Sequence, residues 1–549
     1  MGNVIQFDRL ILSIFFLLLS SCFDQSGLNT NLSSLNTTPA TDQSNSNHND
    51  QTSQPGVVIV TPQPSAASAT TSSTAGVSNP VQVERYITLQ YSEFLSEMNF
   101  SKTTFLGSND FMALSIYDKE SINEQNLFII ANTNDPSSLD LATQYAKQRN
   151  IDSAHIIKIT IPVKSSITYA EAQVIQDAIA VYPQAKGFAL AWSMPYTVGG
   201  KQTITSYVSM GRLAFEKWPV NASGCFYTDT SAYYDRFAEA FTRSPSTVKS
   251  VTVDTSGTVQ VRPSMLLSSH TSQNLSNLAA YSPLSTSIQD YNAGALETIA
   301  KGLSADHKEF VASGYFGITS DTVRSRRATT STYDPKAVST YSTTYNKIKL
   351  NLITGNVLGG KKDILIFQTG LANLDPSESK TNVFLPGAVA DTLTSFSGSL
   401  YGGGQVSALA FLRAGATASY GTSFEPCAYY EKFPESIVYV PNMLVGDTIL
   451  EAYWKSVKLP AEGVFIGEPL ARPYAKGLVS IDQVNRILKI HTRRSALGQY
   501  NLYFSLNGTD TLIASHIQIS SRSVDFSIAV PANIDLKTFT SGQLKLIQQ

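Results

Sequence analysis

The sequence predicts an α/β domain, with a mostly parallel sheet flanked by helices, followed by a small C-terminal β-sandwich. Two patterns lead to this prediction. From residue 126 onward, short apolar runs alternate with segments whose apolar residues recur at spacings of three and four, as strands and helices do in α/β domains. After residue 474, short strand-like runs follow one another with turns between them, which is typical of an all-β domain.

The α/β pattern begins with the apolar run NLFIIA at residues 126–131, which suits a strand buried on both faces. Ser137 can cap the helix that follows this strand. Next come a strand at 156–161, a helix at about 169–181 and a strand at 187–192. This order of elements predicts right-handed crossovers and therefore a parallel sheet.

The remaining elements follow from the same patterns. In the α/β region they are a hairpin at 251–261, a helix around 296–303, strands at 315–319 and 364–368, a helix at 405–413, a strand at 417–420 and a helix at 442–457. C-terminal strands are expected at 478–481, 487–491, 500–505, 512–519 and 524–530. We therefore predict a signal peptide at 1–21, a disordered tether at 22–82, the α/β domain at 83–475 and the β-sandwich at 476–549.

The N-terminus resembles a bacterial lipoprotein signal peptide. Residues 10–19 read LILSIFFLLL, an apolar run shorter than the roughly twenty residues that a membrane-spanning helix needs. The LSSC at 19–22 resembles a lipobox, which implies cleavage before Cys22 and lipidation of its thiol. The alternative is an uncleaved anchor or a plain secretory peptide with a chance cysteine. We expect a lipid anchor in a membrane of the cell envelope, with the protein periplasmic or surface-exposed.

The segment after this cysteine has the composition of a flexible tether. Residues 23–82 are mostly Ser, Thr, Asn, Gln, Pro, Gly and Ala and contain no Lys or Arg. Such a segment cannot bury enough apolar surface to fold, and its mean reach would be roughly 40 to 45 Å.

The charge of the whole chain argues against nucleic-acid binding. Forty Lys and Arg stand against 42 Asp and Glu, so there is no positive surplus to neutralise a phosphate backbone. Charged residues make up 15% of the chain, whereas soluble domains typically have about 25%. This composition suits an envelope or extracellular protein.

Several motifs are spread over about residues 125–475. They include NTNDPSSLDLATQYAKQR at 132–149, WSMPY at 192–196, RPSMLL at 262–267, LPGA at 385–388, RAGAT at 413–417, EPC at 425–427 and IGEPL at 466–470. In order and spacing these motifs resemble an uncharacterised bacterial family associated with exosortase-bearing genomes. The layout of that family distantly resembles the gingipain and caspase-like cysteine peptidases, in which an immunoglobulin-like domain follows an α/β domain.

The resemblance to these peptidases implies a catalytic dyad, with a histidine after one strand and a cysteine after the next. The loop after the strand at 364–368 reads TGLA at 369–372 and contains neither residue. Thr392 stands where the uncharacterised family usually has histidine. We therefore expect the cysteine-peptidase dyad to be absent.

Four residues are catalytic candidates for a hydrolase that would use other groups. Asp391, Thr394 and Ser395 could supply an acid and hydroxyls to a cleft, and Glu425 could add a second carboxylate. No G-x-S-x-G motif surrounds Ser395, and helix capping explains the Asp-x-x-Thr-Ser sequence equally well.

Seven further residues are candidates for ligand binding. They are Asn132, Asp135, Tyr196, Asp321, Arg324, Arg327 and Glu468. The first three follow predicted strands, and ligands of parallel sheets lie beyond the carboxyl ends of strands. The two arginines could clamp a carboxylate or a phosphate, or they could pair with internal acids.

The other two cysteines, Cys225 and Cys427, are expected to form a disulfide, because thiols in an oxidising compartment are more often paired than free. Two buried free thiols, or a nucleophilic Cys427, are the alternatives. The six histidines show no metal-binding spacing such as HxH or HExxH, so no metal and no cofactor are predicted.

These observations favour an envelope-anchored lipoprotein with a non-catalytic binding role on a caspase-like or gingipain-like scaffold. The expected partners are the membrane, through the lipid, and a peptide, a glycan or an envelope protein. A hydrolase that uses Asp391, Ser395 and Glu425 is the alternative.

Overall fold

The computed structural model describes residues 86–90, 112–220, 224–236, 238–239, 250–254, 260–270, 288–308, 310–329, 347–374, 381–474, 477–493, 495–521, 524–540 and 542–549. The chain divides into two units, Met1–Pro64 and Ser65–Gln549, and all described residues belong to the second. The expected signal peptide, the lipidation site Cys22 and the expected tether lie outside the described residues.

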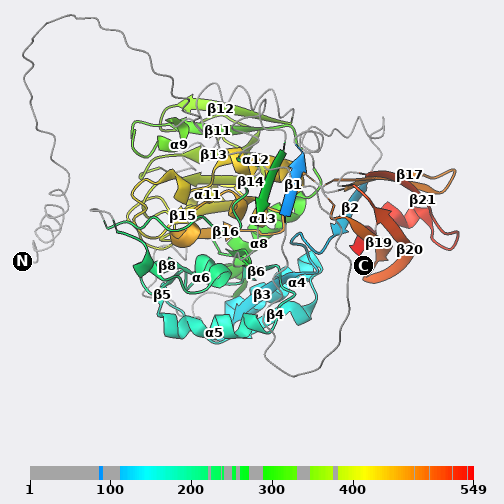
Figure 1. The fold of residues 1–549 in the computed structure, drawn as a ribbon, viewed down its shortest axis with the longest axis horizontal. Helices are drawn as coiled ribbons and strands as arrows, with labels where there is room; N and C mark the ends of the chain where they lie inside the picture. Colours follow the sequence, from blue (N-terminus) through cyan, green and yellow to red (C-terminus); the bar gives the residue numbers. More distant parts are fainter. Residues whose placement is uncertain are drawn as a thin grey trace, which may run out of the picture. The chain divides into compact units, whose positions relative to one another are not determined.

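A ten-stranded sheet flanked by helices forms the centre of the α/β region (Figure 1). This confirms the predicted α/β class. In order across the sheet, the strands are β12 (Ile348–Thr354), β11 (Ala312–Ile318), β13 (Ile364–Thr369), β14 (Phe384–Thr392), β15 (Ala418–Thr422), β16 (Gly463–Gly467), β10 (Ser264–Leu266), β6 (Gly187–Leu190), β3 (Leu127–Asn132) and β4 (Ile156–Ile159).

The direction of the strands changes once across this sheet. Every neighbouring pair among these described strands is parallel except β15 and β16, which are antiparallel. Strands β12, β11, β13, β14 and β15 therefore run one way, and β16, β10, β6, β3 and β4 run the other way. As a result, the carboxyl ends of the two halves lie at opposite edges of the sheet.

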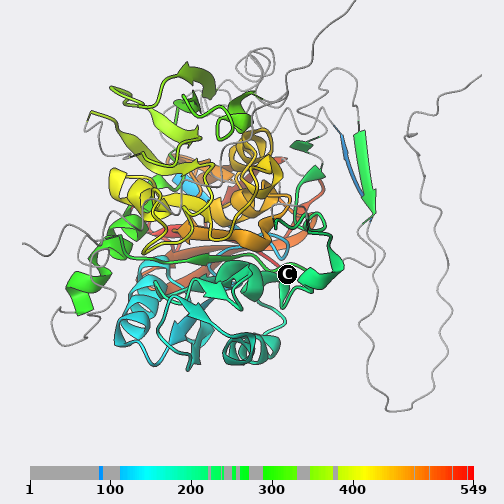
Figure 2. The same cartoon turned by 90° about the vertical axis from the view of Figure 1, so that its left-hand side faces the viewer.

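Helices cover both faces of this sheet (Figure 2). Successive side chains of β3 alternate between the two cores, so Ile129 packs in one core and Phe128 and Ile130 in the other. The first core includes residues of α4 (Pro136–Arg149), α8 (Ile288–Ala305), α12 (Ser436–Leu444) and α13 (Ile449–Lys455). The second includes residues of α5 (Tyr169–Ala180), α6 (Ile204–Met210) and α11 (Ala408–Ala414).

Local sequence explains where several helices begin and end. Asp135, rather than the expected Ser137, is the N-cap of α4, and its side chain accepts a hydrogen bond from the Ser137 amide. The single helix expected at 442–457 is instead two helices, α12 and α13. Gly446 separates them with a φ of 95°, and Thr448 begins the second helix with a capping box.

A hairpin was expected at 251–261, but residues 255–259, which include its turn, lie outside the described residues. Strand β9 (Ser250–Asp254) pairs with β1 (Tyr86–Gln90) in an antiparallel two-stranded sheet. The partner of β9 therefore comes from a distant segment, which turn signals in the sequence cannot identify. The remaining short elements are β5 (Ser166–Ile167), β7 (Thr197–Val198), β8 (Gln202–Thr203), α9 (Arg326–Thr329), η1 (Ser153–His155), η2 (Phe215–Lys217), η5 (Tyr430–Lys432), η6 (Pro460–Glu462) and η7 (Leu536–Thr540).

The described residues after Tyr474 are all-β apart from one short 3-10 helix. Their seven-stranded sheet has the order β20 (Thr509–Ile519), β19 (Gly498–Leu506), β22 (Gln543–Gln548), β2 (Met112–Tyr117), β17 (Gly477–Asp482), β18 (Ile487–Thr492) and β21 (Val524–Ala529). Leu114 and Ile116 of β2 share a core with Val479, Leu488 and Leu502. A strand from before the α/β region therefore completes this sheet, which the boundary expected at residues 475 and 476 does not include.

No helix in the described part of the chain is both long enough and apolar enough to cross a membrane.

Candidate functional site

The strongest gathering of predicted site residues lies where β11, β13 and β14 end. These strands are neighbours and parallel, so their carboxyl ends meet at one edge of the sheet. The segment after β11 contributes Asp321 and Arg324, and α9 contributes Arg327. Gly370, just after β13, allows a close approach of this segment, because a Cβ there would lie 1.9 Å from the carbonyl oxygen of Arg324. We call Asp321, Arg324 and Arg327, together with Asp391 and Thr394 at the end of β14, the carboxyl-edge site.

Arg327 and Asp391 form a buried ion pair in this site. The Arg327 Nη2 and Asp391 Oδ1 atoms are 2.5 Å apart, and the two side chains are 4% and 0% exposed. Gln368 donates a hydrogen bond to the other carboxylate oxygen at 3.4 Å. Burial raises the pKa of the Asp391 carboxyl, and the positive charge of Arg327 opposes this rise. Both oxygens of Asp391 are thus engaged by neighbouring side chains.

Backbone carbonyl oxygens also accept hydrogen bonds from Arg327 and Gln368, the two partners of Asp391. Arg327 donates to the carbonyl oxygens of Thr369, at 3.1 Å, and Pro434, at 3.3 Å. Gln368 also donates to Pro434, at 3.1 Å. The Arg327 guanidinium lies 5.5 Å from the ring centroid of Phe433. These contacts make the pair a structural link between α9, β13, β14 and the segment before α12.

Arg324 belongs to a second chain of contacts at the same edge. Its Nη1 lies 2.5 Å from Asp321 Oδ2, and its Nε donates to Thr394 Oγ1 at 3.2 Å. The Thr394 hydroxyl donates in turn to Gln405 at 2.6 Å. Burial would raise the pKa of Asp321, but hydrogen bonds from the Arg324 backbone and side chain outweigh it and hold the pKa below its usual value. Asp321, Arg324 and Thr394 are therefore brought together.

A small pocket opens beside the two arginines. Its volume is about 10 Å³, close to what a single water molecule needs. It is lined by Phe316, Gly317, Arg324, Ser325, Arg327, Ala328, Gln368 and Thr369. Arg324 is the more exposed of the two arginines, at 30% against 4%. Such a pocket can hold a single water molecule and cannot enclose a peptide or a sugar.

Ser395 and Glu425 do not join Asp391 in an acid and nucleophile arrangement. The carbonyl oxygens of Thr394 and Ser395 accept hydrogen bonds from the Thr422 hydroxyl, which ties this loop to the end of β15. Within the described residues, the Ser395 hydroxyl has no hydrogen bond to a histidine or a carboxylate. Glu425 is exposed and accepts a hydrogen bond from the Cys427 amide at 2.9 Å.

The candidates at the ends of β3 and β6 lie at the opposite edge of the sheet. Asn132 is fully buried, donating to the Ile161 carbonyl at 3.0 Å and accepting from the Ile161 amide at 3.1 Å. Asp135 caps α4. Tyr196 is buried, with its ring centroid 6.3 Å from that of Tyr401, and burial raises its pKa. These side chains stabilise local structure and do not converge with Asp391.

Glu468 lies in a buried network of charges. It accepts hydrogen bonds from the Tyr145 hydroxyl at 2.7 Å and from Arg149 Nε at 3.0 Å. Arg149 also pairs with Asp306. The Arg472 amide donates to Asp306 at 2.9 Å, which links the two arginines through this acid. Glu468 is therefore a buried structural acid, and its partners carry no sequence spacing that could have identified them.

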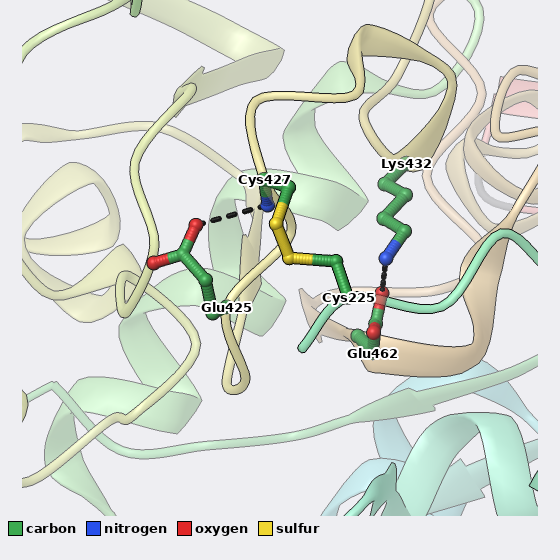
Figure 3. The surroundings of a disulfide bond; sticks show 5 residues. All are labelled: Cys225, Glu425, Cys427, Lys432 and Glu462. Atoms are coloured by element: carbon green, nitrogen blue, oxygen red, sulfur yellow. Dashed lines mark hydrogen bonds and ion pairs between the residues drawn. A yellow bond between two sulfur atoms is a disulfide. The ribbon is translucent and has the colours of Figure 1, made fainter. Parts of the chain in front are cut away.

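A buried pair of opposite charges, Lys432 and Glu462, lies near Cys225 and Cys427 (Figure 3). The Cα atoms of Cys225 and Cys427 are 6.0 Å apart, a separation that is usual for disulfides, so the bridge predicted from the sequence can form here. Lys432 Nζ lies 2.5 Å from Glu462 Oε2, and these side chains are 1% and 3% exposed. Burial raises the pKa of Glu462 to about 7, although Lys432 opposes the rise. No motif in the sequence marks this ion pair, because the two residues lie in unrelated segments.

Comparison of the chain with protein-family models, with curated proteins and with solved structures found no match. Thr369 and Thr392 lie opposite each other in the neighbouring strands β13 and β14. These threonines end strands that are followed by neither a histidine nor a cysteine, in residues 370–374 and 393–398.

Proposed function

We propose that this protein is a lipid-anchored protein of the bacterial cell envelope whose folded region binds a partner without catalysing a reaction. Asp391 carries this proposal, because it is the acid candidate at the carboxyl ends of the strands. A general acid must reach the substrate atom that it protonates, and a general base the proton that it removes. The carboxylate of Asp391 is instead 0% exposed and paired with Arg327.

The binding site that we propose is the surface around Arg324. This arginine lines the small pocket and its side chain is 30% exposed, whereas the neighbouring Ser325 and Thr369 are buried. A guanidinium can bind a carboxylate by charge-assisted hydrogen bonds. Because Asp321 and Thr394 already engage Nη1 and Nε of Arg324, a partner carboxylate would bind at Nη2 or displace Asp321. We therefore propose that the partner presents a carboxylate, as an acidic peptide, an acidic glycan or an envelope protein would.

We also propose that the scaffold is of the caspase or gingipain type and that the C-terminal sheet folds as an immunoglobulin-like β-sandwich. The parallel strands β11, β13 and β14 with helices on both faces support the first statement. The β-sandwich is supported by the single core to which β2 and the strands on both sides of it contribute.

Binding can be tested with the full chain and a fluorescent peptide library in which every member has a free carboxyl end, together with its amidated twin. We expect members of the library to bind, and we expect amidation or Arg324→Ala to weaken binding at least about tenfold. Arg326→Ala is the matched control, because Arg326 is an exposed arginine in the same segment and does not line the pocket. Equal loss in both variants would contradict the assignment of the site.

Catalysis can be tested with fluorophosphonate and activated-ester probes. We expect no labelling of the folded protein above that of heat-denatured protein. Labelling that Ser395→Ala abolishes would overturn the non-catalytic proposal and favour the hydrolase.

The lipid anchor is tested separately, since Cys22→Ala or globomycin treatment should change the mature mass. Unchanged masses would exclude lipidation at Cys22.

A further inference from the structure

Three potential metal ligands lie together at the turn after β15, apart from the carboxyl-edge site. The sulfur atoms of Cys225 and Cys427 and a carboxylate oxygen of Glu425 all lie within 4.8 Å of one another. The two cysteines are 202 residues apart in sequence, so only the fold brings them together. In Figure 3 the Glu425 carboxylate lies beside the pair of sulfurs.

The local backbone holds Glu425 in this position. Its Oε1 accepts the Cys427 amide hydrogen at 2.9 Å. Cys427 and Ala428 both have a φ of 52°, which turns the chain sharply just after Glu425. Cys225 is 2% exposed, Cys427 is half-buried and Glu425 is exposed. Glu425 is therefore the member of the cluster that is most open to solvent.

The charges around the cluster favour a cation once the thiols are free. The nearby Lys432 is neutralised by its buried ion pair with Glu462. Two thiolates and the Glu425 carboxylate together carry three negative charges. Soft sulfur ligands combined with a carboxylate select zinc and similar thiophilic ions over magnesium or calcium.

We propose that the reduced pair of Cys225 and Cys427, with Glu425 as third ligand, binds Zn²⁺. A dithiol reductant supplies the two electrons and two protons that convert the disulfide into two thiols, and is itself oxidised to a disulfide. The ion then displaces both thiol protons, forming two Zn–S bonds and one Zn–O bond, with water in the fourth position. The cysteine pair thereby exchanges a covalent bridge for a metal bridge.

The spacing of the two cysteines suits both states. Two sulfurs that are each about 2.3 Å from a tetrahedral ion lie about 3.8 Å from each other. This separation is within the 4.8 Å that already encloses the three ligand atoms. The Cα separation of 6.0 Å can therefore be kept while the sulfurs move apart by side-chain rotation.

The test uses the full chain carrying Cys22→Ala, so that only the two cysteines of the cluster contribute thiols. The protein is reduced with a phosphine and titrated with Co²⁺ as a spectroscopic probe, followed by competition with Zn²⁺. We expect one Co²⁺ per chain, a sulfur-to-cobalt charge-transfer band, and protection of both thiols from alkylation by Zn²⁺. The oxidised protein should show no such band.

Glu425→Gln should weaken Zn²⁺ binding at least about tenfold. Glu431→Gln is the matched control, an acid on the same loop that is outside the cluster, and it should leave the affinity unchanged. The proposal is overturned if no thiolate band forms, if Zn²⁺ does not slow alkylation, or if Glu425→Gln binds as tightly as the control. The alkylation measurement needs no substitution within the cluster, so it decides the question even where Glu425→Gln unfolds the chain.

Discussion

Replacing Asp391 with alanine tests whether this acid is structural or catalytic. At an effective dielectric constant of about 20, unit charges 2.5 Å apart attract each other by about 7 kcal/mol, before desolvation is subtracted. Removing one partner of a buried pair leaves the other charge without compensation. Because Arg327 is 4% exposed and held by two carbonyl oxygens, its guanidinium cannot easily move to solvent. We expect Asp391→Ala to lower the free energy of unfolding by about 3 to 5 kcal/mol.

The measurement is chemical denaturation followed by circular dichroism, with Asp321→Ala as the control. Asp321 pairs with Arg324 at the same edge, but these side chains are 25% and 30% exposed, so we expect a loss of at most about 1 kcal/mol. Combining Asp391→Leu with Arg327→Met should recover most of the lost stability, because neither buried charge then remains. The structural interpretation fails if Asp391→Ala costs no more than Asp321→Ala. It also fails if Asp391→Asn folds as stably as the wild type while abolishing a measured hydrolysis.

Other predictions concern the remaining buried groups. Glu462 has a folded pKa of about 7 against an ordinary value of 4.5, so the stability it contributes is complete below pH 4.5 and is lost as the pH rises through 7. Glu462→Gln should flatten this decline, of up to about 3 kcal/mol, in unfolding curves measured from pH 4 to 9; an unchanged slope would contradict it. Glu468→Gln should cost about 2 to 3 kcal/mol in urea denaturation, because the buried Arg149 guanidinium loses one of its two carboxylate partners and keeps only Asp306, whereas Glu297→Gln, at a site 56% exposed, should cost at most about 1 kcal/mol. If Cys225 and Cys427 are bridged, mass spectrometry without reduction should find no alkylatable thiol in either, and reduction should destabilise the chain by about 4 to 5 kcal/mol; two reactive thiols would exclude the bridge.

The elements that sequence analysis predicted well are those encoded by local patterns. The strand expected at 364–368 is β13, and the strand expected at 187–192 corresponds to β6. Each is a short apolar run between polar segments, and burial on both faces requires that pattern. The prediction of a single helix at 442–457 was wrong. The apolar periodicity continues across Gly446, but the backbone turns at this residue and interrupts the helix.

The candidate site was only partly predictable, because sequence analysis identifies residue types and not their partners. Asp391 and Arg327 were both candidates, yet their pairing depends on α9 reaching the ends of β13 and β14. The Lys432–Glu462 ion pair was not predicted, because neither residue lies in a recognisable motif. Their burial follows from packing between distant segments, which periodicity does not encode.

By itself the sequence determined the α/β class, the change to strands after residue 474 and the threonines at the ends of the two central strands. Composition and short-range periodicity carry such information directly. Only the tertiary structure decided that β15 and β16 are antiparallel, which places Asn132 and Asp391 at opposite edges of the sheet. It also decided which charges are buried in pairs. Strand direction and burial depend on contacts between residues far apart in the chain, and so they follow from the packing of the whole domain.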